Sequence, residues 1–413
     1  MPRRSGGARV APRLRRVVVL THNSNIFLQR EIDALARVFD EVVILAWVDD
    51  GAPLRLPANA VHLGSFEGFA PSRWQHLGRF LSIRFLGPFL RVALHEVRRR
   101  RSLRRWASFV WACLLGAHIA DLPGLREAVS APDRDVTLYS FWASDPSYAI
   151  PWLPRPTSGW VVRHHSADLY EWASGYLPLW PWIAEHSDFN LFVSDHALRY
   201  ALSRAPSIAP RSAVRILGSV DGGIGPVPGP GIPTVVSCSS LAPVKRVPLL
   251  ARALARLDMP VRWIHLGSGP EEQAVLEALE GADQVEFDLR GQVDHDEVIR
   301  FFRETPVSVF VNVSDREGVA VSICEALSFG IPVVATAAGG SPEIVGRDHG
   351  TGVLVPLDAD ATTVAAGIAE VIRLGREEFQ PRREWERRLN ADDNADSLAQ
   401  WLLHSEKWIR PRR

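Results

Sequence analysis

Short runs of β-branched residues alternate along the chain with segments whose apolar positions recur every three or four residues. The first run, Val17–Leu20, is followed by a polar loop, a segment with helical spacing and a second run, Val42–Ala46. Strand, helix and strand in this order form a βαβ unit, which requires a parallel sheet. The same pattern continues at 136–141, 159–164 and 189–194. The first half of the chain is therefore predicted to be a Rossmann-like α/β domain.

A segment rich in glycine and proline separates this series from a second one. Residues 221–233 hold five glycines and four prolines in 13 positions, a composition typical of a linker. Beyond it, runs such as VRWIHLG and VSVFVNVS alternate with helical patterns. The fold class is therefore predicted to be α/β, with two doubly wound parallel-sheet domains facing a cleft at the carboxyl ends of their strands.

A chain of 413 residues is long enough to form two domains, each with its own hydrophobic core. The patterns along the chain also predict where these domains begin and end. The predicted parts are a basic N-terminal tail (1–15), a first domain (16–220) that includes a basic aromatic segment (66–125), the linker (221–233), a second domain (234–384) and a C-terminal helix that packs back on the first domain (385–413).

Charge is distributed unevenly although the formal net charge is zero. Residues 1–232 carry 27 Lys and Arg against 19 Asp and Glu, while residues 233–413 carry 20 against 28. This asymmetry indicates that the first half faces something anionic. The basic residues follow no nucleic-acid reader motif, so we expect no nucleic-acid partner.

The cysteines and the apolar runs argue against a disulfide-rich, zinc-binding or membrane-spanning protein. The three cysteines are far apart and have no CxxC spacing, which indicates neither a zinc site nor a disulfide framework and fits a reducing compartment. The longest apolar run, 109–120, is shorter than the ~20 residues that a spanning helix needs. We therefore expect a cytoplasmic protein without a transmembrane helix.

The most informative stretch is Ser314–Ile344. It predicts a strand over 307–313, an exit loop that carries Glu317, and a helix from Val319 that carries Glu325 about two turns in. The amides at such a helix start form an anion site, and flanking carboxylates accept hydrogen bonds from hydroxyls. Spacing alone leaves open a plain helix N-terminus with incidental glutamates.

This stretch resembles the Glu-x7-Glu signature of the fourth family of retaining glycosyltransferases, whose members have the GT-B fold. The motifs EG, EAL, GIPVVAT, GG and EIV follow in family order. LAPVKRVPLL resembles the family's lysine loop, HLGSGPEE its Gly-x-Gly-Pro turn, GQVDHDEV its base-binding strand end and GTGVLVPLD its closing loop. The resemblance covers nearly the whole second domain.

The resemblance implies a role for each matching residue in binding a nucleoside-diphosphate-sugar. Glu317 and Lys245 would be catalytic: Glu317 would bind hydroxyls of the donor sugar, and Lys245 would meet the diphosphate. The other implied donor-binding residues are Glu325 (ribose), Gly318 and Val319 (backbone amides), Gly267, Gly269, Gly291 and Gln292 (nucleotide), and Arg246 (diphosphate). Ser240 stands where the family often has another arginine, and Arg246 is the candidate substitute.

Neither a metal nor a cofactor is expected. The bond that breaks leaves a nucleoside diphosphate, so charge develops on phosphate oxygens. A cation and a helix N-terminus placed at that point stabilise this charge without a metal.

The first domain resembles the branch of the family that builds capsular and extracellular polysaccharides. NIFLQREI and RHHSADLY (163–170) match this branch, the latter as R-x-H-x-x-D-x-Y. The resemblance implies that His165 is catalytic and that four further residues line the acceptor side or the cleft: Arg163, Asp168, Tyr170 and Asn25. A His–His pair beside an aspartate is also compatible with a purely structural role.

The segment 66–125 is the part least similar to the family, and it combines arginines with many aromatic residues. Pro88 is predicted to open a helix with Leu90, Leu94 and Val97 on one face, followed by a basic collar at 98–101. One interpretation places 73–105 on an anionic membrane surface, at the inner face of the plasma membrane. The other is a core-facing helix with a solvated arginine side.

The leading hypothesis is a retaining hexosyltransferase that moves a sugar from a nucleotide-sugar donor to an acceptor hydroxyl, such as that of a lipid-linked or growing polysaccharide. A second hypothesis is a non-catalytic nucleotide-sugar-binding subunit of an assembly complex. A third is a sugar-nucleotide epimerase of the same fold, against which the complete series of motifs argues.

Overall fold

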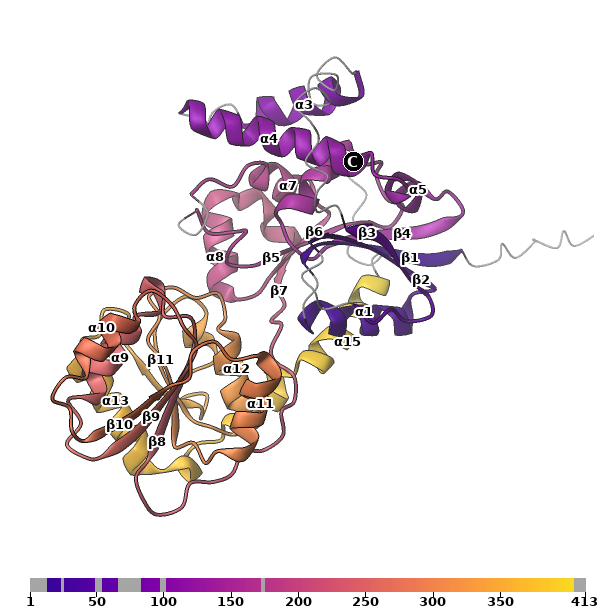
Figure 1. Cartoon of the computed structure of the whole chain (residues 1–413). Helices are drawn as coiled ribbons and strands as arrows, with labels where there is room; N and C mark the ends of the chain where they lie inside the picture. The colour runs from indigo at the N-terminus through magenta and orange to yellow at the C-terminus, as the bar shows by residue number, and fades with distance from the viewer. Residues whose placement is uncertain are drawn as a thin grey trace, which may run out of the picture. The chain divides into compact units, whose positions relative to one another are not determined.

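The computed structural model describes residues 13–23, 26–48, 54–65, 83–96, 102–171 and 175–404. They form two compact units, each built around a parallel sheet (Figure 1). Unit 1 takes in the described residues up to Leu191, together with Ala205–Ser212 and those from Asp396 onward. Unit 2 comprises Phe192–Arg204 and Ala213–Ala395.

The first sheet has seven strands in the order β3-β2-β1-β4-β5-β6-β7. Its strands are β1 (Leu14–Asn23), β2 (Glu41–Val48), β3 (Ala60–Ser65), β4 (Arg134–Ser140), β5 (Gly159–His164), β6 (Phe189–Phe192) and β7 (Ser212–Val214). The central strand β1 pairs in parallel with both β2 and β4, so Val17 lies opposite Val42 and Thr137. The predicted runs Val17–Leu20 and Val42–Ala46 are buried strands, as expected for a sheet covered on both faces.

Helices and short helical turns connect these strands. They are α1 (Ile26–Val38), α3 (Ile83–Glu96), α4 (Leu103–Ala120), α5 (Leu125–Ser130), a 3-10 helix (Asp145–Trp152), α7 (Trp180–His186), α8 (Asp195–Arg204) and a second 3-10 helix (Pro206–Arg211). In unit 1, Trp401 packs against Phe189, and Asp396 pairs with Arg37. The C-terminal residues thus contribute to the first unit.

The helix predicted to begin at Pro88 begins earlier. The face that packs against the core of unit 1 is not the predicted one. Pro88 lies inside α3, which begins at Ile83. Phe85, in the turn before Pro88, is buried and stacks on Phe89 and Trp152. The predicted apolar face is exposed at Leu90 and Leu94. The core-facing interpretation is therefore wrong for these two leucines, while Val97 and 98–101 lie outside the described residues.

The second sheet has six strands in the order β10-β9-β8-β11-β12-β13. They are β8 (Thr234–Cys238), β9 (Val261–Leu266), β10 (Val285–Leu289), β11 (Val309–Asn312), β12 (Val333–Thr336) and β13 (Gly352–Val355). The helices are α9 (Val247–Leu254), α10 (Glu272–Ala278), α11 (His295–Glu304), α12 (Val321–Ser328) and α13 (Ala361–Leu374), with 3-10 turns at Pro243–Lys245, Ser341–Glu343 and Arg376–Glu378. The prediction of a second doubly wound α/β domain is confirmed.

Two helix boundaries differ from the prediction. α12 begins at Val321 and not at Val319, so Glu325 is only its fifth residue, little more than one turn in. The C-terminal segment is not one helix: it consists of α14 (Pro381–Glu384), a π-helical turn (Trp385–Leu389) and α15 (Ala391–Leu403). The break occurs at Asn390, whose backbone bridges to Ser219 instead of continuing a helix.

Each sheet contains one position where the strand order reverses. In the first sheet it lies between β1 and β4, and in the second between β8 and β11. Connections leave these neighbouring strands in opposite directions, so a crevice opens outside their carboxyl ends, where open α/β sheets bind ligands. No helix among the described residues has the length and apolar character needed to cross a bilayer.

Candidate functional site

Apart from Glu325, which lies on α12, the predicted donor-binding residues follow four adjacent strands of the second sheet at its carboxyl edge, and a glycine pair not predicted as a site follows the next strand. Gly291 and Gln292 follow β10, Gly267 and Gly269 follow β9, Lys245 and Arg246 follow β8, Glu317, Gly318 and Val319 follow β11, and the Gly339–Gly340 pair follows β12. Residues as far apart in the sequence as Lys245 and Gly340, 95 positions, are thereby gathered along one edge of unit 2.

Lys245 and Glu317 form an ion pair where the strand order reverses. Lys245 Nζ lies 2.6 Å from Glu317 Oε1, and the two side chains are 25% and 9% exposed. The loops that carry them are joined by a backbone hydrogen bond from Asp315 to the Val244 carbonyl, 2.8 Å long. The pair presents an accessible cation beside a carboxylate, which suits a ligand with both phosphate and hydroxyl groups.

Glu325 is buried on α12 and has a partner that sequence reasoning missed. His295 Nε2 lies 2.7 Å from Glu325 Oε1, and the hydrogen bond with Glu325 raises the pKa of His295. His295 is the first residue of α11 and lies within the motif GQVDHDEV. The motif was noted for its glycine and glutamine, and nothing in its spacing indicated the pairing with a residue 30 positions away.

Two glycines at this edge are required by close backbone contacts. A Cβ on Gly267, whose φ is +138°, would lie 1.9 Å from the carbonyl oxygen of Ser239. A Cβ on Gly339, whose φ is +53°, would lie 1.8 Å from the carbonyl oxygen of Glu317. Glycine thus lets the neighbouring loops pack directly against the segments that present Lys245 and Glu317.

The start of α12 and the loop before it supply backbone amides. The N-cap residue, Ala320, provides no side-chain cap, so its first turn leaves amide groups for a ligand or water. Gly340 N donates to the Gly318 carbonyl over 2.7 Å and fixes the loop. The Arg246 guanidinium donates to the carbonyls of Val313, Ser314 and Leu357, which ties the lysine loop to the Glu317 loop.

The predicted residues of unit 1 that the structure describes are all buried, and most of their polar atoms have partners inside that unit. Arg163 pairs with Glu31, which also accepts from Tyr139 Oη over 2.8 Å. Tyr170 is fully buried. Asn25 lies outside the described residues. The interior of unit 1 therefore holds a charged cluster immediately beneath the carboxyl edge of its sheet.

His165 and Asp168 together hold the loop that follows β4. His165 Nε2 lies 2.9 Å from the Phe141 carbonyl, and Asp168 accepts from the amides of Ala143 and His165, each over 2.6 Å. Burial, reinforced by the charge of Arg163, lowers the pKa of His165 to about 3, and burial raises the pKa of Asp168 to about 8. His165 is therefore a neutral, fixed side chain at neutral pH.

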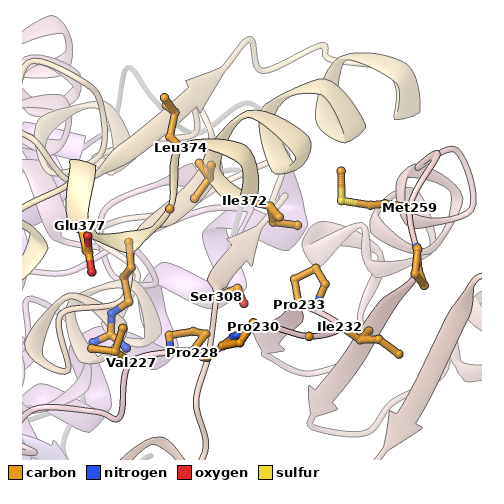
Figure 2. Close-up of a pocket in the computed structure, with 16 residues that line it drawn as sticks. Val227, Pro228, Pro230, Ile232, Pro233, Met259, Ser308, Ile372, Leu374 and Glu377 are labelled. Carbon is orange, nitrogen blue, oxygen red and sulfur yellow. The ribbon is translucent and has the colours of Figure 1, made fainter.

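A pocket of about 660 Å³ lies at the opposite edge of the second sheet (Figure 2). Its wall includes Pro233, Pro260 and Ser308, which directly precede β8, β9 and β11, and the end of α13. Ligands of open α/β sheets bind at the carboxyl ends of the strands, so this pocket is not where the Lys245–Glu317 site would receive its ligand.

Comparison with known proteins finds sequence matches to part of the chain and structural matches to its fold. Residues 232–374 match the family model described as "Glycosyl transferases group 1". The chain is 31% identical over 167 residues to a protein of Escherichia coli K12 described as "Putative colanic acid biosynthesis glycosyltransferase WcaL", covering 38% of this chain and 40% of that protein. The chain thus spans about two fifths of the length of this curated relative.

Solved structures match over nearly the whole chain. Sucrose-phosphate synthase (tll1590) from Thermosynechococcus elongatus aligns with a TM-score of 0.64 at 16% identity, over 95% of this chain and 99% of that one. Anabaena Alr3699/HepE in complex with UDP aligns with a TM-score of 0.60 at 17% identity, over 94% and 99%. The predicted GT-B fold, with its two parallel-sheet α/β domains, is confirmed.

Proposed function

We propose that this protein is a glycosyltransferase that moves a sugar from a nucleoside-diphosphate-sugar to an acceptor hydroxyl, with retention and without a metal. The observation that carries the proposal is the Lys245–Glu317 ion pair at the strand-order reversal of the second sheet. The match of residues 232–374 to the glycosyl transferases group 1 model supports it independently.

In this proposal, one set of groups in the site binds the charged diphosphate and another set binds the hydroxyls of the donor. Lys245 moves from Glu317 to the diphosphate and, with the amides of Gly318, Val319 and the start of α12, stabilises the charge that develops as the glycosidic bond breaks. Glu317 then accepts hydrogen bonds from the donor sugar, and Glu325 accepts them from the ribose.

The remaining residues of unit 2 shape the site around the nucleotide. The segment from Gly267 to Gly269 and the pair Gly291–Gln292 border the nucleoside. Arg246 acts mainly by holding the lysine loop, since its guanidinium already donates to three carbonyls. In unit 1, Arg163, His165, Asp168 and Tyr170 support the acceptor side.

We further propose that the donor is a nucleotide hexose and that the acceptor is a growing or lipid-linked cell-surface glycan. The relative described as a colanic acid biosynthesis glycosyltransferase and the HepE complex with UDP-glucose support this choice. The competing role, a non-catalytic nucleotide-sugar-binding subunit, shares the binding residues and differs only in turnover.

The test combines ligand binding with turnover. The unfolding midpoint of the wild-type protein should rise with UDP or another nucleoside diphosphate, because a ligand that binds only the folded state stabilises it. Release of nucleoside diphosphate from a panel of UDP- and GDP-sugars should fall on the order of 10²–10³-fold in K245A and in E317A, as for loss of a transition-state charge contact. R262A and E286A break an exposed ion pair in the same unit and should leave the rate unchanged. Unchanged rates in both K245A and E317A refute the proposal.

A second proposal concerns the surface of α3 and α4, which both belong to unit 1 (Figure 1). Leu86, Leu90 and Leu94 repeat every four residues along α3 and are exposed, and Leu103, Trp106 and Trp111 are exposed on α4. Exposed arginines stand among them at 84, 91, 104 and 105. Leucine and tryptophan beside arginine is the composition of a helix that lies on an anionic lipid surface.

This surface would place the enzyme at the inner face of the plasma membrane, beside a lipid-linked acceptor. At low salt the wild-type protein should co-sediment with vesicles of phosphatidylglycerol, and the double variant L90E/L94E should not. L276E, which changes a half-exposed leucine of unit 2, is the matched control. Equal sedimentation of L90E/L94E and wild type contradicts the membrane proposal and leaves the transfer reaction unaffected.

A further inference from the structure

A network of buried polar side chains lies next to the lysine loop of unit 2, the segment between β8 and α9. Trp263 and His265 are two positions apart on β9, and His265 is paired in register with Ser237 on the neighbouring strand β8. All three residues are buried. Buried polar groups are costly unless they are hydrogen-bonded, so the partners of these side chains decide what the network does.

The hydrogen bonds of this network can run in one direction only. Trp263 Nε1, which can only donate, lies 3.0 Å from Ser237 Oγ. Ser237 Oγ lies 2.8 Å from His265 Nδ1, and His265 Nε2 lies 3.1 Å from the Ser239 carbonyl oxygen, which can only accept. The indole therefore donates to the hydroxyl, the hydroxyl donates to Nδ1, and Nε2 donates to the carbonyl. The network thus fixes the tautomer of His265 and ends at the backbone of the lysine loop.

Burial keeps the imidazole of His265 in this neutral form. The pKa of His265 is lowered to about 4, because burial disfavours the charged ring. At neutral pH the ring therefore has one donor and one acceptor nitrogen, and each of them has its partner in the network.

The Ser239 carbonyl lies at the start of the lysine loop, which is attached closely to the end of β9. Ser239 N donates to the Leu266 carbonyl over 3.0 Å, and Leu241 N donates to the Ser268 carbonyl over 2.9 Å. Gly267, which leaves room for the Ser239 carbonyl because it has no Cβ, lies between these two carbonyls in the sequence. Gly267 thus provides the space for the Ser239 oxygen, and His265 provides its side-chain donor.

The other end of the lysine loop is attached to the loop that carries Glu317. Asp315 N donates to the Val244 carbonyl, and the guanidinium of Arg246 is bound to three carbonyls. Lys245 lies between these contacts, and its side chain is 25% exposed. The position of its ammonium group therefore depends on how both ends of the loop are held.

We propose that His265 is a positioning residue of the donor site: by donating to the Ser239 carbonyl, it holds the lysine loop in the conformation from which Lys245 reaches the diphosphate. This inference rests on the proposed function and adds a buried residue that acts through Lys245. Without His265 the Ser239 carbonyl loses this donor, and the start of the loop gains conformations in which the carbonyl turns toward water. The ammonium group is then less often at the position of the diphosphate.

UDP binding, measured by isothermal titration, tests the inference. The H265L variant should bind UDP about tenfold more weakly, as for loss of a buried hydrogen bond. Its affinity for uridine should be unchanged, because uridine has no diphosphate for Lys245 to contact. H265Q should keep most of the wild-type affinity for UDP, since its side-chain amide can donate to the Ser239 carbonyl.

A second pair of variants separates positioning from a general loss of packing. I264V removes part of a buried side chain on the same strand, outside the network, and should lower the unfolding midpoint without changing UDP affinity. S237A removes the hydroxyl that holds Nδ1 and should weaken UDP binding about threefold. It provides the same comparison of UDP with uridine if H265L does not fold.

A double-mutant cycle shows whether His265 acts through Lys245. In a K245A background, H265L should weaken UDP binding by less than about twofold, because the group that His265 positions is already missing. Wild-type UDP affinity in H265L, a loss in H265Q as large as in H265L, an equal loss for uridine, or additive effects in the cycle overturns the inference alone. A wild-type protein that binds no nucleoside diphosphate overturns the proposed function instead.

Discussion

Each of the two sheets has an ion pair at the position where its strand order reverses, yet the surroundings of the two pairs differ. Lys245–Glu317 in unit 2 is surrounded by glycine-containing loops in close backbone contact and by the amides of α12. His22–Asp145 in unit 1 rests on a layer of buried charged and aromatic side chains. The first environment suits a phosphate that the backbone must approach closely, and the second suits a side chain that must be held in one orientation.

The difference shows how one topology can present two chemically different sets of groups. A parallel sheet supplies a crevice at its strand-order reversal whatever the sequence. In unit 2 the polar groups that line it come largely from loops, so the glycine pattern specifies the site. In unit 1 they are the side chains of His22 and Asp145, which share no short motif, although the motif at 163–170 marks part of the buried network beneath them.

The buried network of unit 1 should contribute the largest single effect on stability. In Glu31→Gln, the guanidinium of Arg163 loses its buried counter-charge, and removing one partner of a buried pair costs about 3–5 kcal/mol. Urea unfolding of E31Q measures this loss. Glu286→Gln, at an exposed pair in unit 2, should cost about 0–1 kcal/mol. Equal effects of the two substitutions would mean that the buried network does not support unit 1.

The backbone packing of unit 2 should come next. In Gly339→Ala, the new Cβ meets the Glu317 carbonyl oxygen at 1.8 Å, at a φ of +53°. Overpacking together with backbone strain should cost about 2–4 kcal/mol and displace Glu317 from Lys245. Isothermal titration with UDP should show weakened binding. Gly281 has a similar φ of +75°, but a Cβ there would meet no neighbouring atom within 4 Å. Gly281→Ala is therefore the control that introduces backbone strain without overpacking. If Gly339→Ala and Gly281→Ala bind UDP with the same affinity, the close packing at Gly339 does not affect the binding site.

The sequence predicted the parts of this molecule that depend on local pattern. β-branched runs predicted the sheets, because strands covered on both faces need apolar side chains throughout. Except for Glu325 on α12, the motif residues of unit 2 lie along one edge, since they are carried by the loops that follow neighbouring strands. The pairing of His295 with Glu325 and that of His22 with Asp145 were missed, because they join residues 30 and 123 positions apart that share no motif. Leu90 and Leu94 were assigned to one apolar face correctly, but the spacing could not tell whether that face meets the core or solvent.

Neutral buried histidines in unit 1 should make its stability sensitive to acid. Burial lowers the pKa of His164 to about 4 and that of His165 to about 3. The unfolded chain binds protons at these sites below about pH 6.5, whereas the folded protein resists until pH 4 or below. Stability is therefore unaffected by these groups above pH 6.5 and falls as the pH drops toward 4, by at most about 1.4 kcal/mol per pH unit for each group.

Substitution of one histidine isolates this contribution. In His164→Gln the fall in the free energy of unfolding between pH 6.5 and 4.5 should be shallower than in the wild type, measured by urea unfolding at each pH. The exposed His404 provides the matched control, and H404Q should keep the wild-type slope. A wild-type slope in H164Q would indicate that other groups control the acid sensitivity of unit 1.

The smallest predicted effect concerns His295. Its hydrogen bond to Glu325 is a side-chain contact within the site of unit 2, which is otherwise lined mainly by backbone groups. His295 donates to one oxygen of Glu325, so the carboxylate keeps a fixed orientation in which the other oxygen can accept from ribose. His295→Gln should weaken UDP binding about fivefold, as for loss of a ~1 kcal/mol hydrogen bond, with kcat unchanged.

This loss of affinity should largely disappear with 2′-deoxy-UDP if Glu325 binds the 2′-hydroxyl. His349→Gln, which alters a histidine beside Glu384 in the same unit, should change neither affinity. A fivefold loss for UDP and its deoxy analogue alike would show that His295 acts on the fold of the site and not through the ribose.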